Sequence, residues 1–238
     1  MLKIAGIIKT SVLDYPKKIV STIFLPGCNF KCPFCHNSDL VLNKNLKLIE
    51  EKEILKDLEK RKKLIDGVCI TGGEPLIQNY KDLSDFIKKI KEINEKLLIK
   101  IDTNGTNPKI LEKLIKNNLA NFIAMDIKNT KKKYAETINS KVNTEDIEKS
   151  IKIINKNTAN KKIDSEFRIT VLPEFHNSED FMKIGQWLKG SKKLVLQKFI
   201  PKNTLDKSFE KKASYSEKEL KEFAKPLRLF FHKIEVRI

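Results

Sequence analysis

Short apolar segments alternate with amphipathic segments along most of the 238-residue chain. The apolar segments are rich in β-branched and aromatic residues, as buried strands are; they cover residues 18–25, 68–71, 97–102, 122–127, 167–172 and 194–200. The segments between them place apolar residues at helical spacing, over 50–65, 80–94, 108–116, 145–155 and 179–188. Strands that alternate with helices in this way predict parallel βα units.

Local signals mark the ends of further elements. Ser178 stands where it could cap a helix, and Ser216 with Glu219 forms the capping-box pattern that opens a last helix. We also expect a terminal strand over 230–238 and an irregular stretch over 40–45.

No linker or shift in composition divides the chain, so we expect a single domain over residues 1–238. Hydrophobic residues make up 40% of the sequence, which is enough to build one large core. Because crossovers between parallel strands are right-handed, the pattern fits either a barrel-like or a doubly wound sheet.

Three of the four cysteines lie close together in CNFKCPFCHN, residues 28–37. Thiolates as close as Cys28, Cys32 and Cys35 suit one metal centre. Iron–sulfur clusters are held by cysteine thiolates, normally four, so a cluster held by three would leave one iron without a protein ligand. An open position on a metal is a place where a substrate can bind.

A structural zinc site is the alternative at this point. It would need a fourth ligand, and His36 directly follows Cys35, so the two side chains point apart. Cys69 could serve only if the fold brings it back, and its place in a predicted strand suggests a small buried core residue instead. A disulfide would leave one of the three clustered cysteines over.

The formal net charge is +17, and only four of the 48 basic residues are arginines. Arginine is the residue favoured for bidentate contacts with phosphates and bases, so this balance argues against nucleic acid as a partner. A lysine-rich composition can reflect heat adaptation. The alternative explanation of the positive charge is a basic face that docks an acidic partner.

No apolar run is long enough to cross a bilayer, so we expect no membrane partner. The first residues include an Asp and a Pro where a signal peptide would keep its apolar stretch. We therefore expect a cytoplasmic protein.

Polar and glycine residues recur at one place, at or just after the carboxyl ends of the predicted strands. Parallel α/β folds build their active sites at that edge. Carboxylates there would attract an ammonium group and cations a carboxylate, so the edge suits a ligand that carries both. The residues are Cys28 to Cys35, Gly72-Gly73-Glu74, Asp102-Thr103-Asn104, Asp126, Lys128, Arg168, Thr170 and Gln197.

The cysteine motif C-x3-C-x2-C, with Phe34 before its third cysteine, resembles the signature of radical S-adenosylmethionine (SAM) enzymes. Gly72-Gly73-Glu74-Pro75 after the second strand resembles the GGE motif of that superfamily. The likeness extends along nearly the whole chain and implies an α/β fold, a partial (βα)6 TIM barrel with helices outside. It also implies that Cys28, Cys32 and Cys35 hold a [4Fe-4S] cluster whose free iron chelates SAM.

Within the superfamily, His36-Asn37, DTNG at 102–105 and MDIK at 125–128 resemble glycyl-radical-enzyme activating enzymes. KTSVLDYP at 9–16, followed by FLPGCNFKCPFCHN at 24–37, is most similar to the activating component of anaerobic ribonucleotide reductase. The resemblance implies an external one-electron reductant such as flavodoxin or ferredoxin, and a 5′-deoxyadenosyl radical that takes hydrogen from a glycine of a partner enzyme. It implies no catalytic side chain beyond the cluster.

The resemblance also implies which residues contact SAM. They are Phe34 and His36 beside the adenine; Gly72, Gly73 and Glu74 at the amino group; and Asp102, Asn104, Lys128 and Arg168 around the ribose and carboxylate.

Two further sites follow from the resemblance. Gln197 stands near the end of the sixth strand, where pyruvate formate-lyase activases tend to carry a histidine, and we count it with the cofactor-binding residues. Asp102, Thr103 and Asp126 match side chains that hold a monovalent cation in some activases.

Two other functions stay open. One is a radical SAM enzyme acting on a small molecule or a tRNA base, similar to 7-carboxy-7-deazaguanine synthase. The other is a zinc-stabilised RNA-binding module, which would be colourless and free of iron, whereas a cluster enzyme would be brown.

Overall fold

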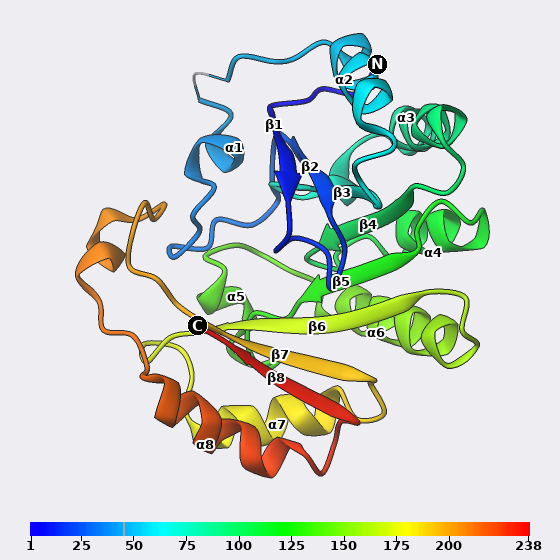
Figure 1. Ribbon diagram of the computed structural model, residues 1–238. Coiled ribbons are helices and arrows are strands. Elements are labelled where there is room, and N and C mark those ends of the chain that lie inside the picture. Colours follow the sequence, from blue (N-terminus) through cyan, green and yellow to red (C-terminus); the bar gives the residue numbers. More distant parts are fainter. Residues whose placement is uncertain (45) are drawn as a thin grey trace.

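One eight-stranded sheet forms the centre of the protein, with its strands in chain order (Figure 1). The computed structural model describes residues 1–44 and 46–238. Strand β1 pairs with β2 antiparallel, and β2 to β8 run parallel. The strands are β1 (Gly6–Ser11), β2 (Val20–Leu25), β3 (Gly67–Gly72), β4 (Leu98–Thr103), β5 (Phe122–Asp126), β6 (Asp164–Val171), β7 (Lys193–Lys198) and β8 (Lys233–Arg237).

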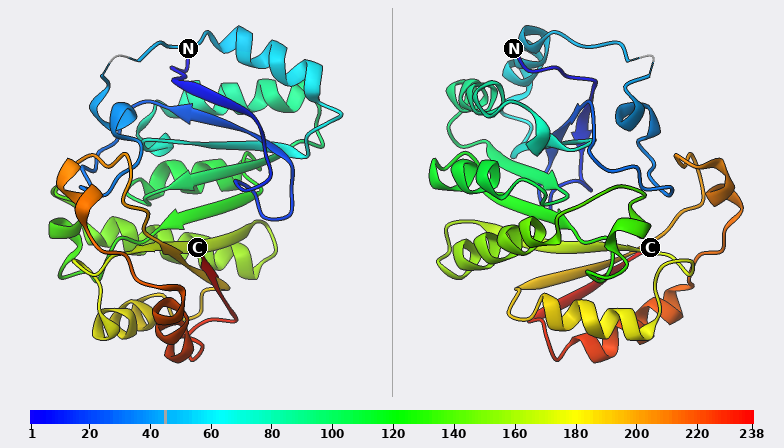
Figure 2. Two further views of the ribbon diagram at one scale, coloured as in Figure 1. Left: turned by 60° about the vertical axis from the view of Figure 1, so that its left-hand side comes forward. Right: turned by 180° about the vertical axis from the view of Figure 1, so that it is seen from behind.

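The longer helices lie along the outer face of the curved sheet (Figures 1 and 2). No helix in the described ranges is long and apolar enough to cross a membrane. The helices are α1 (Ser38–Leu42), α2 (Glu51–Arg61), α3 (Tyr80–Ile93), α4 (Pro108–Lys116), α5 (Tyr134–Thr137), α6 (Thr144–Ala159), α7 (Ser178–Trp187) and α8 (Glu217–Leu227), with 3-10 turns η1 (Pro75–Ile77) and η2 (Lys207–Lys211).

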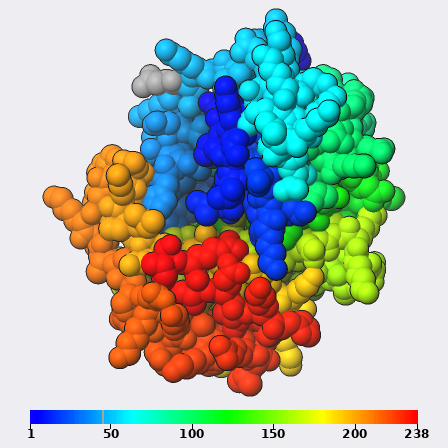
Figure 3. Space-filling model, viewed as in Figure 1, coloured from blue at the N-terminus to red at the C-terminus, as the bar shows by residue number. Residues whose placement is uncertain are grey.

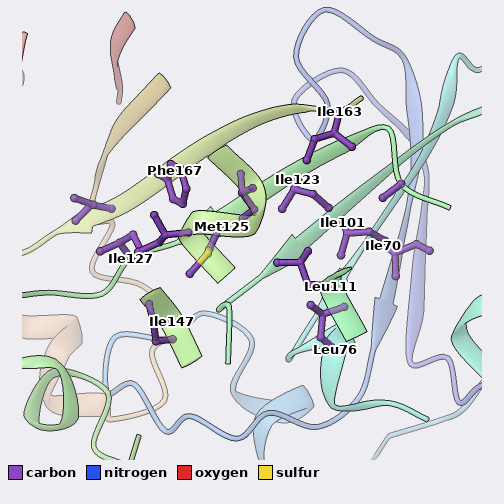
Figure 4. Packing of buried hydrophobic residues seen from close by; sticks show 14 of the residues in the cluster. Ile70, Leu76, Ile101, Leu111, Ile123, Met125, Ile127, Ile147, Ile163 and Phe167 are labelled. Atoms are coloured by element: carbon purple, nitrogen blue, oxygen red, sulfur yellow. The ribbon is translucent and has the colours of Figure 1, made fainter. Parts of the chain in front are cut away.

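The core lies between the sheet and these helices. Ile101 of β4 and Ile123 of β5 are fully buried, and Leu111 of α4 and Ile147 of α6 are buried in the same cluster (Figure 4). The strand face toward the helices is apolar, whereas the opposite face carries polar residues of the site, such as Asp102 of β4 and Arg168 of β6.

The six predicted parallel strands and the helices between them are confirmed, as are the last helix and the terminal strand. Five elements were missed: β1, α1, α5 and the 3-10 turns η1 and η2. The irregular stretch expected over 40–45 is wrong for Leu40–Leu42, which lie in α1, and residue 45 lies outside the described residues. The cap of α7 is Asn177, one residue before the predicted Ser178, because its side chain accepts from the Asp180 amide at 3.0 Å.

The sheet does not close into a full barrel. Strands β1 and β8 are its two edges, and no pairing joins them within the described residues. The N-terminal hairpin and the C-terminal strand are exposed on the same side of the molecule (Figure 3). This open curved sheet agrees with the partial barrel expected from the sequence.

Candidate active site

A cavity of about 430 Å³ lies at the carboxyl ends of the parallel strands. Every site residue predicted from the sequence lines it: Cys28, Cys32, Phe34, Cys35, His36, Gly72, Gly73, Glu74, Asp102, Thr103, Asn104, Asp126, Lys128, Arg168 and Gln197. The residues come from loops and strand ends far apart in the chain, so the fold alone brings them together.

Three free thiols form one wall of the cavity. The loop turns tightly, because the Cys35 amide donates to the Cys32 carbonyl at 3.0 Å and the Phe30 amide contacts Cys28 Sγ at 3.4 Å. Burial raises the pKa of Cys28 to about 11 and that of Cys32 to about 12. Thiolates here need a compensating positive charge, which a metal centre supplies. The donor set therefore fits a cluster held by three cysteines.

The residues that could complete a zinc site are engaged elsewhere. Cys69 is fully buried in β3, and its Sγ lies 3.7 Å from the ammonium of Lys100. His36 Nε2 donates to the Ile200 carbonyl at 2.8 Å. Within residues 1–44 and 46–238, no three His, Cys, Asp or Glu side chains are arranged to hold a single metal ion.

The glycine motif is joined to the backbone that leads into the cysteine loop. The Gly73 amide donates to the Leu25 carbonyl at 2.9 Å, and the Glu74 amide donates to the Gly27 carbonyl at 2.8 Å. The side chain of Asn37 donates to the Gly72 carbonyl at 3.0 Å. The two motifs are therefore one structural unit.

Glu74 connects the glycine motif to the segment after β4. Its buried carboxylate accepts from the Leu76 amide at 2.9 Å, from the Thr103 hydroxyl at 2.7 Å and from the Asn104 amide. Burial raises the pKa of Glu74 to about 7, against the opposing effect of these hydrogen bonds. The group can therefore change its charge near neutral pH.

A network of charges occupies the centre of the cavity. The guanidinium of Arg168 donates to Asp126 at 2.8 Å and to Asp102 at 3.2 Å. Lys128 lies 3.1 Å from Asp126, and Lys100 contacts Asp102. Burial alone would raise the pKa of Asp126, but the charges of Arg168 and Lys128 outweigh it and hold the pKa well below its usual value.

Both carboxylates predicted to hold a monovalent cation already contact cationic side chains. The hydroxyl of Thr103, the third predicted ligand, donates to Glu74. A bound cation would have to share Asp102 and Asp126 with Arg168. The cation site stays a prediction.

Aromatic contacts hold the rings of Phe34 and His36, the two residues predicted to lie beside the adenine. Phe34 is 5% exposed and packs on Phe175 with 5.8 Å between ring centroids. His36 stacks on Phe199 at 6.1 Å.

Comparison with known sequences decides the family. The model of the radical SAM superfamily matches residues 22–188, a range that holds the cysteine loop, the glycine motif and Arg168. This chain belongs to the radical SAM superfamily. Radical SAM enzymes use a [4Fe-4S] cluster and SAM, and the reduced cluster supplies one electron to the sulfonium of SAM. In this radical SAM enzyme, the thiols of Cys28, Cys32 and Cys35 would hold the cluster.

Two relatives support the same family. A candidate glycyl-radical enzyme activating enzyme of Methanocaldococcus jannaschii is 36% identical over 98% of this chain and 95% of its own length. The pyruvate formate-lyase-activating enzyme of Clostridium pasteurianum is 32% identical over 54% of this chain and 53% of its own length.

Solved structures show the same radical SAM fold. Coproporphyrinogen III oxidase of Escherichia coli has a TM-score of 0.59 at 16% identity, over 92% of this chain and 54% of that chain. The enzyme anSMEcpe, solved with bound AdoMet, has a TM-score of 0.55 at 19% identity, over 71% of this chain and 48% of that chain. This chain thus spans about half the length of these structures.

Sequence reasoning missed several residues of the site, Val41 of the cavity wall among them. Asp14, Phe24 and Thr71 line the cavity, and the Thr71 hydroxyl donates to Asp102 at 3.2 Å. Lys100 is 2% exposed beneath Asp102. Its signal was visible, because a lysine two residues before Asp102 in an apolar strand lies on the same face.

Proposed function

We propose that this radical SAM enzyme is a glycyl-radical-enzyme activating enzyme. The observation that carries this proposal is the 36% identity to the candidate activating enzyme of Methanocaldococcus jannaschii over 98% of the chain. The resemblance of residues 9–16 and 24–37 to the activating component of anaerobic ribonucleotide reductase supports that reductase as the partner.

The cavity offers SAM a place for each of its polar groups. Glu74 stands at the glycine motif, where the amino group would lie. Lys128 and Arg168 present positive charge for the carboxylate, and Asp102 with Asn104 offers polar groups for the ribose. Phe34 and His36 would supply ring and backbone contacts for the adenine, and Gln197 also lines the cavity.

The reaction needs one electron from an external carrier such as flavodoxin or ferredoxin. One electron added to SAM breaks the C5′–S bond and gives methionine and a 5′-deoxyadenosyl radical. That radical takes the Cα hydrogen of the partner's glycine, which leaves 5′-deoxyadenosine and a glycyl radical. No side-chain acid or base takes part, so the work of the chain is to orient SAM and exclude water.

The test is an anaerobic assay with the reconstituted enzyme, SAM, a reductant and anaerobic ribonucleotide reductase. We expect a glycyl radical signal in electron paramagnetic resonance, together with 5′-deoxyadenosine. The Cys32→Ala variant serves as the control and gives neither product. If SAM is cleaved but neither this reductase nor pyruvate formate-lyase acquires a radical, the proposal is wrong and the substrate belongs to another class.

A further inference from the structure

A segment between β7 and α8 crosses directly over the cysteine loop. We call residues 199–215 the strap; it is the orange segment that projects from the sheet in Figures 1 and 2. The Leu205 amide donates to the Cys35 carbonyl at 2.9 Å, and the Asp206 amide donates to the Pro33 carbonyl at 2.9 Å. The strap is therefore joined by a direct hydrogen bond to Cys35, one of the residues that would hold the cluster.

The strap is packed in place. Phe209 stacks on Phe175 at 5.8 Å, and Phe175 packs on Phe34, which lies between two of the cysteines. Thr204 is fully buried, and its hydroxyl donates to the Asp206 carbonyl at 2.7 Å. The inner side of the strap is thus part of the wall around the cysteine loop.

The outer side of the strap is basic. Lys202 and Lys211 are exposed, as is Lys31 of the cysteine loop, and none of the three has a carboxylate partner among the described residues. Lys207 and Lys212 are also exposed, although each contacts a glutamate. The four lysines of the strap therefore outnumber its two acidic residues, Asp206 and Glu210, on a surface that contacts the cysteine loop.

We propose that the strap and Lys31 form the docking surface for an acidic one-electron carrier protein of the flavin or iron–sulfur type. The inference rests on the proposed function, which needs such a carrier. The carrier loses one electron and the cluster gains one, with no proton or group transferred. Opposite charges steer the carrier to this surface. The hydrogen bonds from Leu205 and Asp206 hold the strap against the cysteine loop, so a carrier docked on the strap lies close to the cluster ligands.

The test compares two double variants with the same change in net charge. The first is Lys202→Glu with Lys211→Glu on the strap. The second is Lys96→Glu with Lys116→Glu, two exposed lysines that precede β4 and β5 at the opposite end of the sheet. The probe is photoreduced flavodoxin, with loss of the cluster's visible absorbance followed by stopped flow and affinity measured by titration.

We expect the strap variant to be reduced by flavodoxin on the order of 10-fold more slowly at low salt, with weaker binding, and this difference to shrink as salt is added. The Lys96/Lys116 variant should stay close to wild type. Both variants should react normally with photoreduced deazaflavin, a small donor that needs no docking surface.

Three results would overturn the inference. Equal slowing of both variants would mean that only the total charge matters. Slow reduction of the strap variant by deazaflavin would mean that the substitutions disturb the cluster. Normal reduction by flavodoxin with slower glycyl-radical formation would assign the surface to the substrate protein. The reduction and binding measurements need no glycyl-radical partner, so a failure of the proposed function leaves them readable.

Discussion

Gly73 lies directly against Gly27: a β-carbon on Gly73 would stand 1.8 Å from the Gly27 carbonyl oxygen. Gly27 immediately precedes the first cysteine of the loop. The glycine motif therefore sets the position of the cysteine loop through direct backbone contact, besides its hydrogen bonds.

We expect Gly73→Ala to displace the cysteine loop, because the added methyl meets backbone and no side chain can turn away. The iron content after reconstitution should fall well below that of wild type, and the free energy of unfolding should fall by about 1–3 kcal/mol. Gly6→Ala is the matched control, since its β-carbon would meet only Phe24, at 3.9 Å. Full iron loading of Gly73→Ala would contradict this account.

The four cysteines should separate into two classes. Cys32→Ala should lose the brown colour and bind little iron, because two thiolates cannot hold the cluster. Cys69→Ala should keep about four irons per chain and lose roughly 1 kcal/mol of stability from the small cavity left in β3. Iron counting and visible spectra after anaerobic reconstitution would check this, and loss of iron from Cys69→Ala would refute it.

Arg168→Gln should destabilise the fold. The substitution leaves Asp102 and Asp126 close together without the guanidinium that contacts both. Removing one partner of a buried ion pair costs about 3–5 kcal/mol, although Lys100 and Lys128 should reduce the loss here. Urea unfolding measures it. Arg168→Lys, which keeps the charge, should lose less, and equal losses for both variants would show that charge is not the cause.

His176 should make the protein less stable in acid. Burial lowers its pKa from 6.5 to about 4, and its ring joins the Leu172 amide at 3.2 Å to the Lys128 carbonyl at 2.9 Å. Below pH 6.5 the unfolded chain binds a proton that the folded chain refuses, so stability falls as the pH drops from 6.5 to 4.

The full loss is about 3 kcal/mol. Denaturant unfolding at several pH values would measure it. In His176→Gln, which has no titrating ring, this part of the pH dependence should disappear; an unchanged pH profile would count against His176 as its source.

The sequence predicted the parallel strands and the site because both depend on local patterns. Each strand is a short apolar run, and the site residues lie within or just after these runs, so the topology brings them together. Strand β1 gave no such signal, because residues 8–10 are exposed in it and its pairing depends on β2.

The strap and Lys100 also escaped sequence reasoning, for a different reason. The importance of the strap comes from its hydrogen bonds to Cys35 and Pro33, which are distant in sequence. Lys100 matters through Asp102 and Cys69, and only the folded chain shows that its ammonium is buried. The contacts of the strap have no local pattern to read, whereas Lys100 had a local signal, its place in an apolar strand two residues before Asp102.

In the part of the chain that the structure describes, β1 and β8 are the two edges of the curved sheet and do not pair with each other. A fully closed barrel of this size would admit a substrate only along its axis, whereas no strand pairing closes this sheet between β1 and β8. A loop of another folded protein could therefore enter without being threaded by a free end. The bound loop would itself shield the cavity from solvent, so the cavity would be fully closed only while the two proteins are bound to each other.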